Sequence, residues 1–154
     1  MAIITPSIDQ VRQGNMRQRS QKTQITTAQV LALNATPIEV VAAPGAGLIN
    51  IPTQIHLFLD YNSAAYAGVA GGEDLTLNYT GGAQMIAIEA TGFIDASADD
   101  HAYGNVAAGV VGESKTPVVN AAMTLGFLVG EVTTGNSPLD VEVFFNTIVS
   151  VPVV

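Results

Sequence analysis

The stretch Leu139-Asp-Val-Glu-Val-Phe-Phe-Asn-Thr-Ile-Val-Ser-Val151 alternates apolar or β-branched side chains with polar ones. Its odd-numbered positions hold Leu, Val, Val, Phe, Thr, Val and Val, whereas Asp140, Glu142, Asn146 and Ser150 occupy even-numbered positions. Every second side chain of a β-strand points to the same face. The pattern therefore predicts a long strand whose odd-numbered residues face a core.

The same period of two recurs elsewhere in the chain. Residues 49–59 predict a second long strand with its odd-numbered side chains inside, and residues 75–80 and 86–90 predict a hairpin around Gly81-Gly82. A further strand fits residues 121–129. Many short strands, Gly-rich turns and almost no helix indicate an all-β fold, either an antiparallel sandwich or a barrel.

Two segments depart from the strand pattern. Thr26 and Gln29 have the spacing of a capping box, which predicts about two helical turns ending at Asn34. Residues 95–116 predict a loop with one helical turn, followed by an uncertain strand.

The composition indicates one domain that associates with copies of itself. The chain has 154 residues, 48% of them hydrophobic and 12% charged, and no cysteine. The absence of cysteine excludes disulfide frameworks, thiol catalysis and cysteine-based zinc sites. Because ordinary domains carry about 25% charged residues, part of the outer surface is expected to meet another chain.

The charge is divided unevenly along the sequence. Residues 1–22 hold four basic side chains against one acidic residue, a balance of +3, whereas residues 23–154 hold one lysine against 12 acidic residues, a balance of −11. Residues 1–24 are polar, with scattered apolar positions, and predict an extended basic arm attached to a domain at 25–154. The arm's candidate partner-binding residues are Arg12, Arg17, Arg19 and Lys22.

These features also bear on partners and location. The first ten residues lack the basic and apolar regions of a secretory signal, and no apolar run approaches the roughly 18 residues of a membrane helix. We therefore expect synthesis in the cytoplasm and no membrane partner. Four cations attached to an acidic body also argue against direct binding of nucleic acid.

Two glycine-containing segments partly match nucleotide-binding motifs. Residues 109–116 have the Walker spacing, but Ser114 replaces the second glycine and Pro117 follows where a helix is needed. Gly45-Ala-Gly47 lacks the third glycine of a dinucleotide fingerprint and lies between predicted strands. Both motifs are interpreted as turns, and no cofactor is expected.

The acidic clusters are interpreted as solvated loops. Asp95, Asp99 and Asp100 do not follow the spacing of a calcium loop, so no metal site is expected there. Glu73 and Asp74 are adjacent in a predicted turn, where solvent is expected to surround both carboxylates.

The chain has two histidines, and a zinc site or a catalytic triad would have to use one of them. His56 is predicted on the solvent face of its strand, and His101 beside Asp99 and Asp100 is interpreted as a salt-linked surface residue. A hydrolase centred on His101 with one of these aspartates is the catalytic alternative. Nothing else in the sequence argues for an enzyme, so a non-enzymatic protein is expected.

Two segments resemble small virion proteins of tailed bacteriophages. They are Ala28-Gln-Val-Leu-Ala-Leu-Asn-Ala-Thr-Pro-Ile-Glu-Val-Val-Ala-Ala-Pro-Gly-Ala-Gly47 and Gly135-Asn-Ser-Pro-Leu-Asp-Val-Glu-Val-Phe-Phe-Asn-Thr-Ile-Val149. The resemblance implies a jelly-roll-like β-sandwich that trimerises and binds the major capsid protein outside the head shell as a decoration (cement) protein. It implies a location on the capsid surface of the virion.

A receptor- or glycan-binding virion module, such as a head fibre or tail tip, is the alternative to decoration. Such a module needs exposed aromatic side chains in loops, and Tyr61, Tyr66 and Tyr103 are the candidates.

Overall fold

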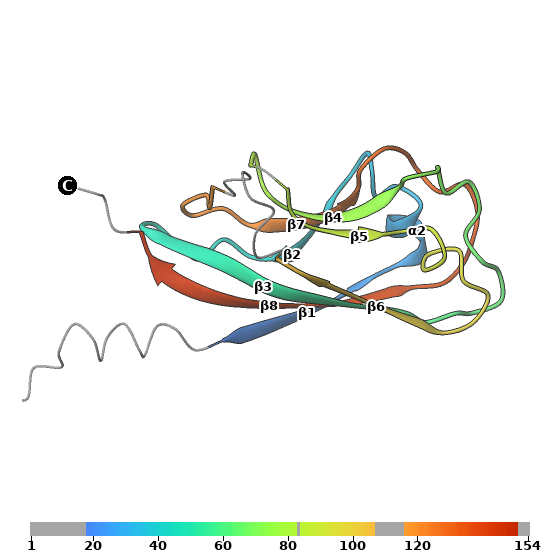
Figure 1. Cartoon of the computed structure of the whole chain (residues 1–154), viewed down its shortest axis with the longest axis horizontal. Coiled ribbons are helices and arrows are strands. Elements are labelled where there is room, and N and C mark those ends of the chain that lie inside the picture. Colours follow the sequence, from blue (N-terminus) through green and yellow to red (C-terminus); the bar gives the residue numbers. More distant parts are fainter. Residues whose placement is uncertain (1–17, 83, 107–115, 151–154) are drawn as a thin grey trace, which may run out of the picture.

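The computed structural model describes residues 18–82, 84–106 and 116–150, and all statements about structure below concern these residues. They form two antiparallel four-stranded sheets packed face to face (Figure 1). The strands are β1 (Arg19–Ile25), β2 (Ile38–Val41), β3 (Leu48–Leu59), β4 (Asp74–Tyr79), β5 (Gln84–Glu89), β6 (Asp100–Asn105), β7 (Met123–Phe127) and β8 (Leu139–Val149). Within these described residues, a short helix, α2 (Thr27–Val30), follows β1.

The strand order defines a jelly roll. One sheet has the order β1-β8-β3-β6 and the other has the order β2-β7-β4-β5. The first strand therefore pairs with the last, the second with the seventh, the third with the sixth and the fourth with the fifth, as in a long hairpin rolled onto itself. The predicted all-β sandwich is confirmed.

Strand β8 has the predicted alternation. Leu139, Val141, Val143, Phe145 and Thr147 are buried, and the residues between them are partly exposed. The strand lies between β1 and β3 and pairs with both. The prediction was wrong at Val149, which is 52% exposed. Val151 lies outside the described residues.

Strand β3 differs from its prediction in its first half. A β-bulge between Pro52 and Gln54 shifts the register against β8, and such a bulge moves the following side chains to the other face. The even-numbered Asn50 is consequently buried before the bulge, whereas the odd-numbered Ile55 and its successors Leu57 and Leu59 are buried after it.

The bulge places a polar network inside the sandwich. Asn50 is 3% exposed, its Nδ2 donates to the backbone carbonyl of Ala42 at 3.1 Å, and its Oδ1 accepts from Thr147 Oγ1 at 2.8 Å. The Tyr79 hydroxyl donates to the backbone carbonyl of Asn50. Burial raises the pKa of Tyr79 to about 12. The network joins β3, β4 and β8, and it satisfies polar groups that would otherwise cost about 1–3 kcal/mol each when buried.

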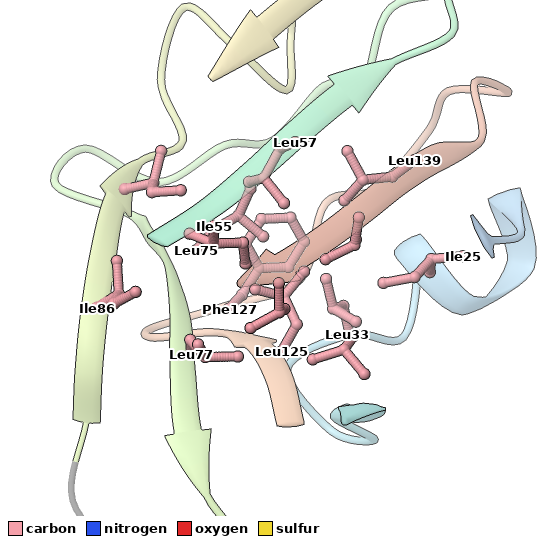
Figure 2. Close-up of a cluster of buried hydrophobic side chains, with 14 of the residues drawn as sticks. Ile25, Leu33, Ile55, Leu57, Leu75, Leu77, Ile86, Leu125, Phe127 and Leu139 are labelled. Carbon is pink, nitrogen blue, oxygen red and sulfur yellow. The ribbon is translucent and has the colours of Figure 1, made fainter. Parts of the chain in front are cut away.

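The core fills the space between the two sheets. In Figure 2, Ile55, Leu57 and Leu139 project from one sheet toward Leu75, Leu77, Ile86, Leu125 and Phe127 of the other. Each fully buried aliphatic side chain contributes about 1.5–3 kcal/mol. Leu33, which follows α2, closes one end of this core with 0% exposure.

The first described strand occupies residues that the sequence assigned to the arm. Arg19–Ile25 forms β1 and pairs with β8 from Arg19↔Phe145 to Ile25↔Leu139. Composition alone did not predict this strand because most of its side chains are polar. Its backbone instead hydrogen-bonds to β8, a strand whose alternate side chains are already buried. Residues 1–17 lie outside the described residues.

The helix keeps its predicted start but not its predicted length. Thr26 is the N-cap, and the capping box is complete, with Gln29 N donating to Thr26 Oγ1 at 3.4 Å and Thr26 N donating to Gln29 Oε1 at 2.9 Å. The helix ends at Val30 because the next backbone donors, Ala32 N and Leu33 N, bond three residues back. Turns carry the chain onward to Asn34 and beyond.

Strand β6 lies in the segment predicted as a loop. Its inward side chains are the small Ala102 and Gly104, which give no apolar alternation. A Cβ atom at Gly104 would lie 2.5 Å from Ile86 Cγ2 and 2.8 Å from Ile88 Cγ1, so the opposite sheet leaves room only for glycine. The strand's signature is therefore small residues alternating with large polar ones.

Candidate functional site

The outer face of the sheet β1-β8-β3-β6 carries two rows of interacting side chains. The registers align Lys22, Glu142, His56 and Tyr103 in one row across the four strands, and Gln24, Asp140, Phe58 and His101 in the next. Directly opposed side chains on neighbouring strands lie about 4.5–5.5 Å apart at Cβ and interact. The fold thus gathers both histidines, two acidic residues and one cation on a single surface.

The two imidazoles are in direct contact. His56 Nε2 and His101 Nδ1 are 2.9 Å apart, although 45 residues separate them in sequence. Their ring centroids are 5.1 Å apart and their planes differ by 12°. Face-stacked rings keep about 3.5 Å between their planes, so a 2.9 Å contact requires the rings to meet edge to edge, with one nitrogen donating to the other.

An aromatic ring flanks each histidine. Tyr103 stacks on His56 with centroids 4.5 Å apart and planes within 7°, and Phe58 packs against His101 at 4.7 Å and 31°. The four rings form a continuous patch, here called the ring cluster (Phe58, His101, His56 and Tyr103). Tyr103 is 61% exposed.

A hollow of about 500 Å³ adjoins the ring cluster. Its lining combines the rings of His56, Phe58 and His101 with residues of β1 and β8, among them Lys22, Gln24, Asp140 and Glu142. Lys22 Nζ lies 3.4 Å from Glu142 Oε2, which is the one ion pair among the described residues. No hydrogen bond or ion pair joins the Asp140 carboxylate to another described side chain.

The surroundings of His56 favour its neutral form. Burial lowers the pKa of His56 below 6.5, and the neighbouring His101 and Lys22 lower it further, whereas Glu142 acts in the opposite direction. Two imidazoles sharing one hydrogen bond cannot both be protonated at that contact without repulsion.

The interpretation of His101 as a salt-linked residue was wrong. Asp99 Oδ1 accepts from the backbone of Tyr61 at 2.9 Å, and Asp100 Oδ1 accepts from the backbone N–H of His101 at 2.8 Å. Neither carboxylate contacts the imidazole, so the arrangement required by the hydrolase alternative is not formed. The partner of His101 is His56, which the sequence could indicate only once residues 100–105 were recognised as a strand.

The three tyrosines proposed as loop aromatics differ in environment. Tyr66 is 2% exposed, and its hydroxyl donates to the backbone carbonyl of Ser137, so it supports a loop from inside. Tyr61 is partly exposed beside Asp99. Tyr103 is exposed, but it lies on a strand of the ring cluster rather than in a loop.

The four basic candidates are also separated. Lys22 lines the hollow by the ring cluster, whereas Arg19 lines a smaller hollow of about 300 Å³ with Asn50 and Phe145. Arg12 and Arg17 lie outside the described residues.

The acidic pair at residues 73 and 74 is not solvated as predicted. Glu73 is 1% exposed, and its two carboxylate oxygens accept from the backbone N–H groups of Val129 and Gly130, each at 2.8 Å. Asp74 begins β4. The glycine-rich sequence around Glu73 gave no indication that its carboxylate would accept hydrogen bonds from the backbone N–H groups of the loop after β7.

The remaining motifs have local roles or lie outside the described residues. Gly45 and Gly47 have φ of +105° and +73° in the turn between β2 and β3, as interpreted. Asp95 Oδ1 accepts from the backbone of Gly92 at 2.6 Å. Residues 109–115 of the Walker-like segment 109–116 lie outside the described residues. The described residues contain no group of three or more His, Cys, Asp or Glu side chains arranged to hold a metal, and no helix long and apolar enough to cross a membrane.

These features define an eight-stranded jelly-roll domain with an aromatic and acidic patch on one outer sheet face. No protein-family model matches the sequence, and a search of curated proteins found no significant match. Among solved structures, the fold is similar to a chain described as "Cyanophage Pam1 capsid asymmetric unit", with a TM-score of 0.46, 15% identity and coverage of 86% of this chain and 84% of that chain.

Proposed function

We propose that this chain is a structural virion protein that binds the outside of a phage head shell as a trimer and cements the capsid. The observation that carries the proposal is the jelly-roll strand order, found in a sequence whose segments 28–47 and 135–149 resemble small phage virion proteins. Jelly rolls occur in viral capsid domains and also in lectins, so the fold alone does not choose between these classes.

The surface composition supports association with other chains. Charged residues make up 12% of the sequence, and five large hydrophobic side chains are substantially exposed among the described residues. Leu128 and Val129 are 51% and 62% exposed on a loop whose backbone Glu73 holds in place. Apolar side chains held outward on a fixed backbone suit a contact between protein surfaces.

Cementing follows from linkage. A protein that bridges neighbouring capsomers adds binding energy only to the assembled shell, so it stabilises that shell against the outward pressure of packaged DNA. Residues 1–17, with Arg12 and Arg17 against Asp9, would add a second point of attachment and raise the effective affinity.

The number of copies per virion tests the proposal. Quantitative proteomics or reconstruction of a virion that encodes this chain is expected to find hundreds of copies on the head surface, arranged in threes. A handful of copies at the tail or at one vertex would contradict decoration.

The second candidate is a receptor- or glycan-binding virion module. It is favoured by one observation, the exposed ring of Tyr103 next to an aromatic-lined hollow. Binding to a glycan array that is lost in Tyr103→Ala would support this function, and a blank array would count against it.

A further inference from the structure

The hollow beside the ring cluster contains a carboxylate that has no hydrogen-bond or ion-pair partner among the described residues. Glu142 is paired with Lys22, but Asp140, which lies between Gln24 and Phe58 in its row, has no such partner among the described residues. At neutral pH, with neutral imidazoles, the charges lining the hollow are two carboxylates and one ammonium group. The lining therefore has a net negative charge.

This combination of groups fits a guanidinium group. Arginine stacks its planar head on aromatic rings and donates two parallel hydrogen bonds to one carboxylate, while its aliphatic stem covers apolar surface. The hollow offers the rings of Phe58, His56 and His101 together with the carboxylate of Asp140. A volume of about 500 Å³ is ample for one side chain and its backbone.

We propose that the hollow receives an arginine side chain, Arg12 or Arg17, from the N-terminal segment of a second copy of this chain. The inference rests on the proposed self-association and names the surface that the basic segment binds. Charge complementarity supports this occupant, because residues 1–17 hold two arginines against one aspartate, whereas residues 23–154 have a balance of −11. Seventeen extended residues span up to about 60 Å, which exceeds the roughly 15 Å radius of gyration of such a domain.

The same geometry makes the contact sensitive to pH. The groups that face the imidazole pair are Lys22 and Gln24 on β1, Asp140 and Glu142 on β8, and Phe58 and Tyr103 on β3 and β6. Protonation of His56 would place a positive charge beside the bound guanidinium and repel it. Because burial and the neighbouring His101 lower the pKa of His56 below 6.5, binding is expected to weaken as the pH falls through that lowered pKa.

The two histidines provide a direct probe of occupancy. In the full-length chain labelled with ¹³C at histidine, the two imidazole signals can be assigned with His101→Gln. We expect the double variant Arg12→Gln/Arg17→Gln to shift both signals relative to the unsubstituted chain. The matched control is Arg19→Gln, because Arg19 lines the other hollow and its loss is expected to leave both signals unchanged.

Mixing distinguishes a second copy from the same chain. Unlabelled full-length protein added to the labelled double variant is expected to move its imidazole signals back, in proportion to the concentration added. Asp140→Asn in the labelled partner is expected to abolish this response, whereas Asp60→Asn, an exposed residue outside the hollow, is expected to retain it.

Three outcomes would overturn the inference. Equal imidazole signals in the double variant and the unsubstituted chain would mean that the arginines do not occupy the hollow. A difference between them that mixing cannot reverse would assign the hollow to the same chain's own segment. A mixing response that survives Asp140→Asn would place the contact elsewhere. The proposed function is tested separately, by the number of copies on a virion, and none of these three results depends on that number.

Discussion

The carboxylate of Glu73, in the turn just before β4, accepts a hydrogen bond from the backbone N–H of Val129 at 2.8 Å, across 56 residues of sequence. Its second oxygen accepts from Gly130 at the same distance. One buried side chain thus satisfies two donors of the loop that follows β7 and fixes the exposed Leu128 and Val129 in position. A fixed loop loses less entropy on binding a partner than a mobile one.

Glu73→Gln is expected to destabilise the fold by about 1–3 kcal/mol, because an amide replaces one acceptor oxygen with a donor that faces a backbone N–H. Chemical denaturation measures the change in the free energy of unfolding. The control is Glu89→Gln, at an exposed residue, which is expected to change it by less than about 0.5 kcal/mol. Equal effects of the two substitutions would show that the buried carboxylate does not hold the loop.

Gly104→Ala tests the close approach of the two sheets at β6. The new methyl group would lie 2.5 Å from Ile86 Cγ2 and 2.8 Å from Ile88 Cγ1, and overpacking of this kind costs about 1–3 kcal/mol. Because Gly71 has nothing within 4 Å of an added Cβ, Gly71→Ala is the matched control and should be nearly neutral. Thermal unfolding of both variants measures the difference, and equal melting temperatures would contradict the packing described here.

The stability of the fold is expected to depend on His56. Burial and His101 lower the folded-state pKa of His56 below the 6.5 of an unfolded chain. The unfolded state therefore binds more protons just below pH 6.5, and the free energy of unfolding falls as the pH decreases through this window. The stabilisation is present above pH 6.5 and is lost as the pH falls through the lower, folded-state pKa.

Denaturation curves between about pH 7.5 and pH 5.5 measure this effect in a range above most carboxylate pKa values. His56→Gln is expected to flatten the dependence while the unsubstituted chain retains it. A dependence of equal slope in both proteins would assign it to other groups.

The parts of the fold that could be predicted from the sequence are those in which apolar and polar side chains alternate or in which a local motif marks an element. Strand β8 and the hairpin β4–β5 have strong apolar periods, and the capping box at Thr26 depends on local spacing alone. Strands β1 and β6 were not predicted because their inward positions are polar or small, apart from Ile25 at the end of β1, and because they pair with residues more than 40 positions away.

The candidate site could not be predicted from the sequence for the same reason, since it depends on strand pairing between distant residues. His56 was correctly placed on the outer face of its strand, but its companion arrives from β6, which was interpreted as a loop. The bulge after Pro52 is a second long-range effect, since nothing in residues 49–59 marks where the alternation changes phase. Register across strands is a tertiary property, and a single sequence contains it only indirectly.

The pairing of β1 with β8 predicts where the chain can be shortened. Deleting residues 2–17 leaves Arg19–Ile25 intact, so the eight-stranded fold is expected to persist with unchanged thermal stability. Deleting residues 2–24 removes all of β1 except Ile25 and exposes the backbone donors and acceptors of β8 along the sheet edge. Such an open edge invites pairing with other chains, so the longer deletion is expected to lower the melting temperature and to aggregate.

The two truncations separate attachment from folding. If residues 1–17 tether the protein to its assembly, the shorter deletion should weaken binding to heads in a co-sedimentation assay while its circular dichroism remains that of the full chain. Co-sedimentation equal to that of the full chain would remove the tether from the proposal and leave the binding to the domain alone. Loss of the β-sheet spectrum in the shorter deletion would instead show that residues before Gln18 belong to the folded domain, contrary to the boundary that β1 sets.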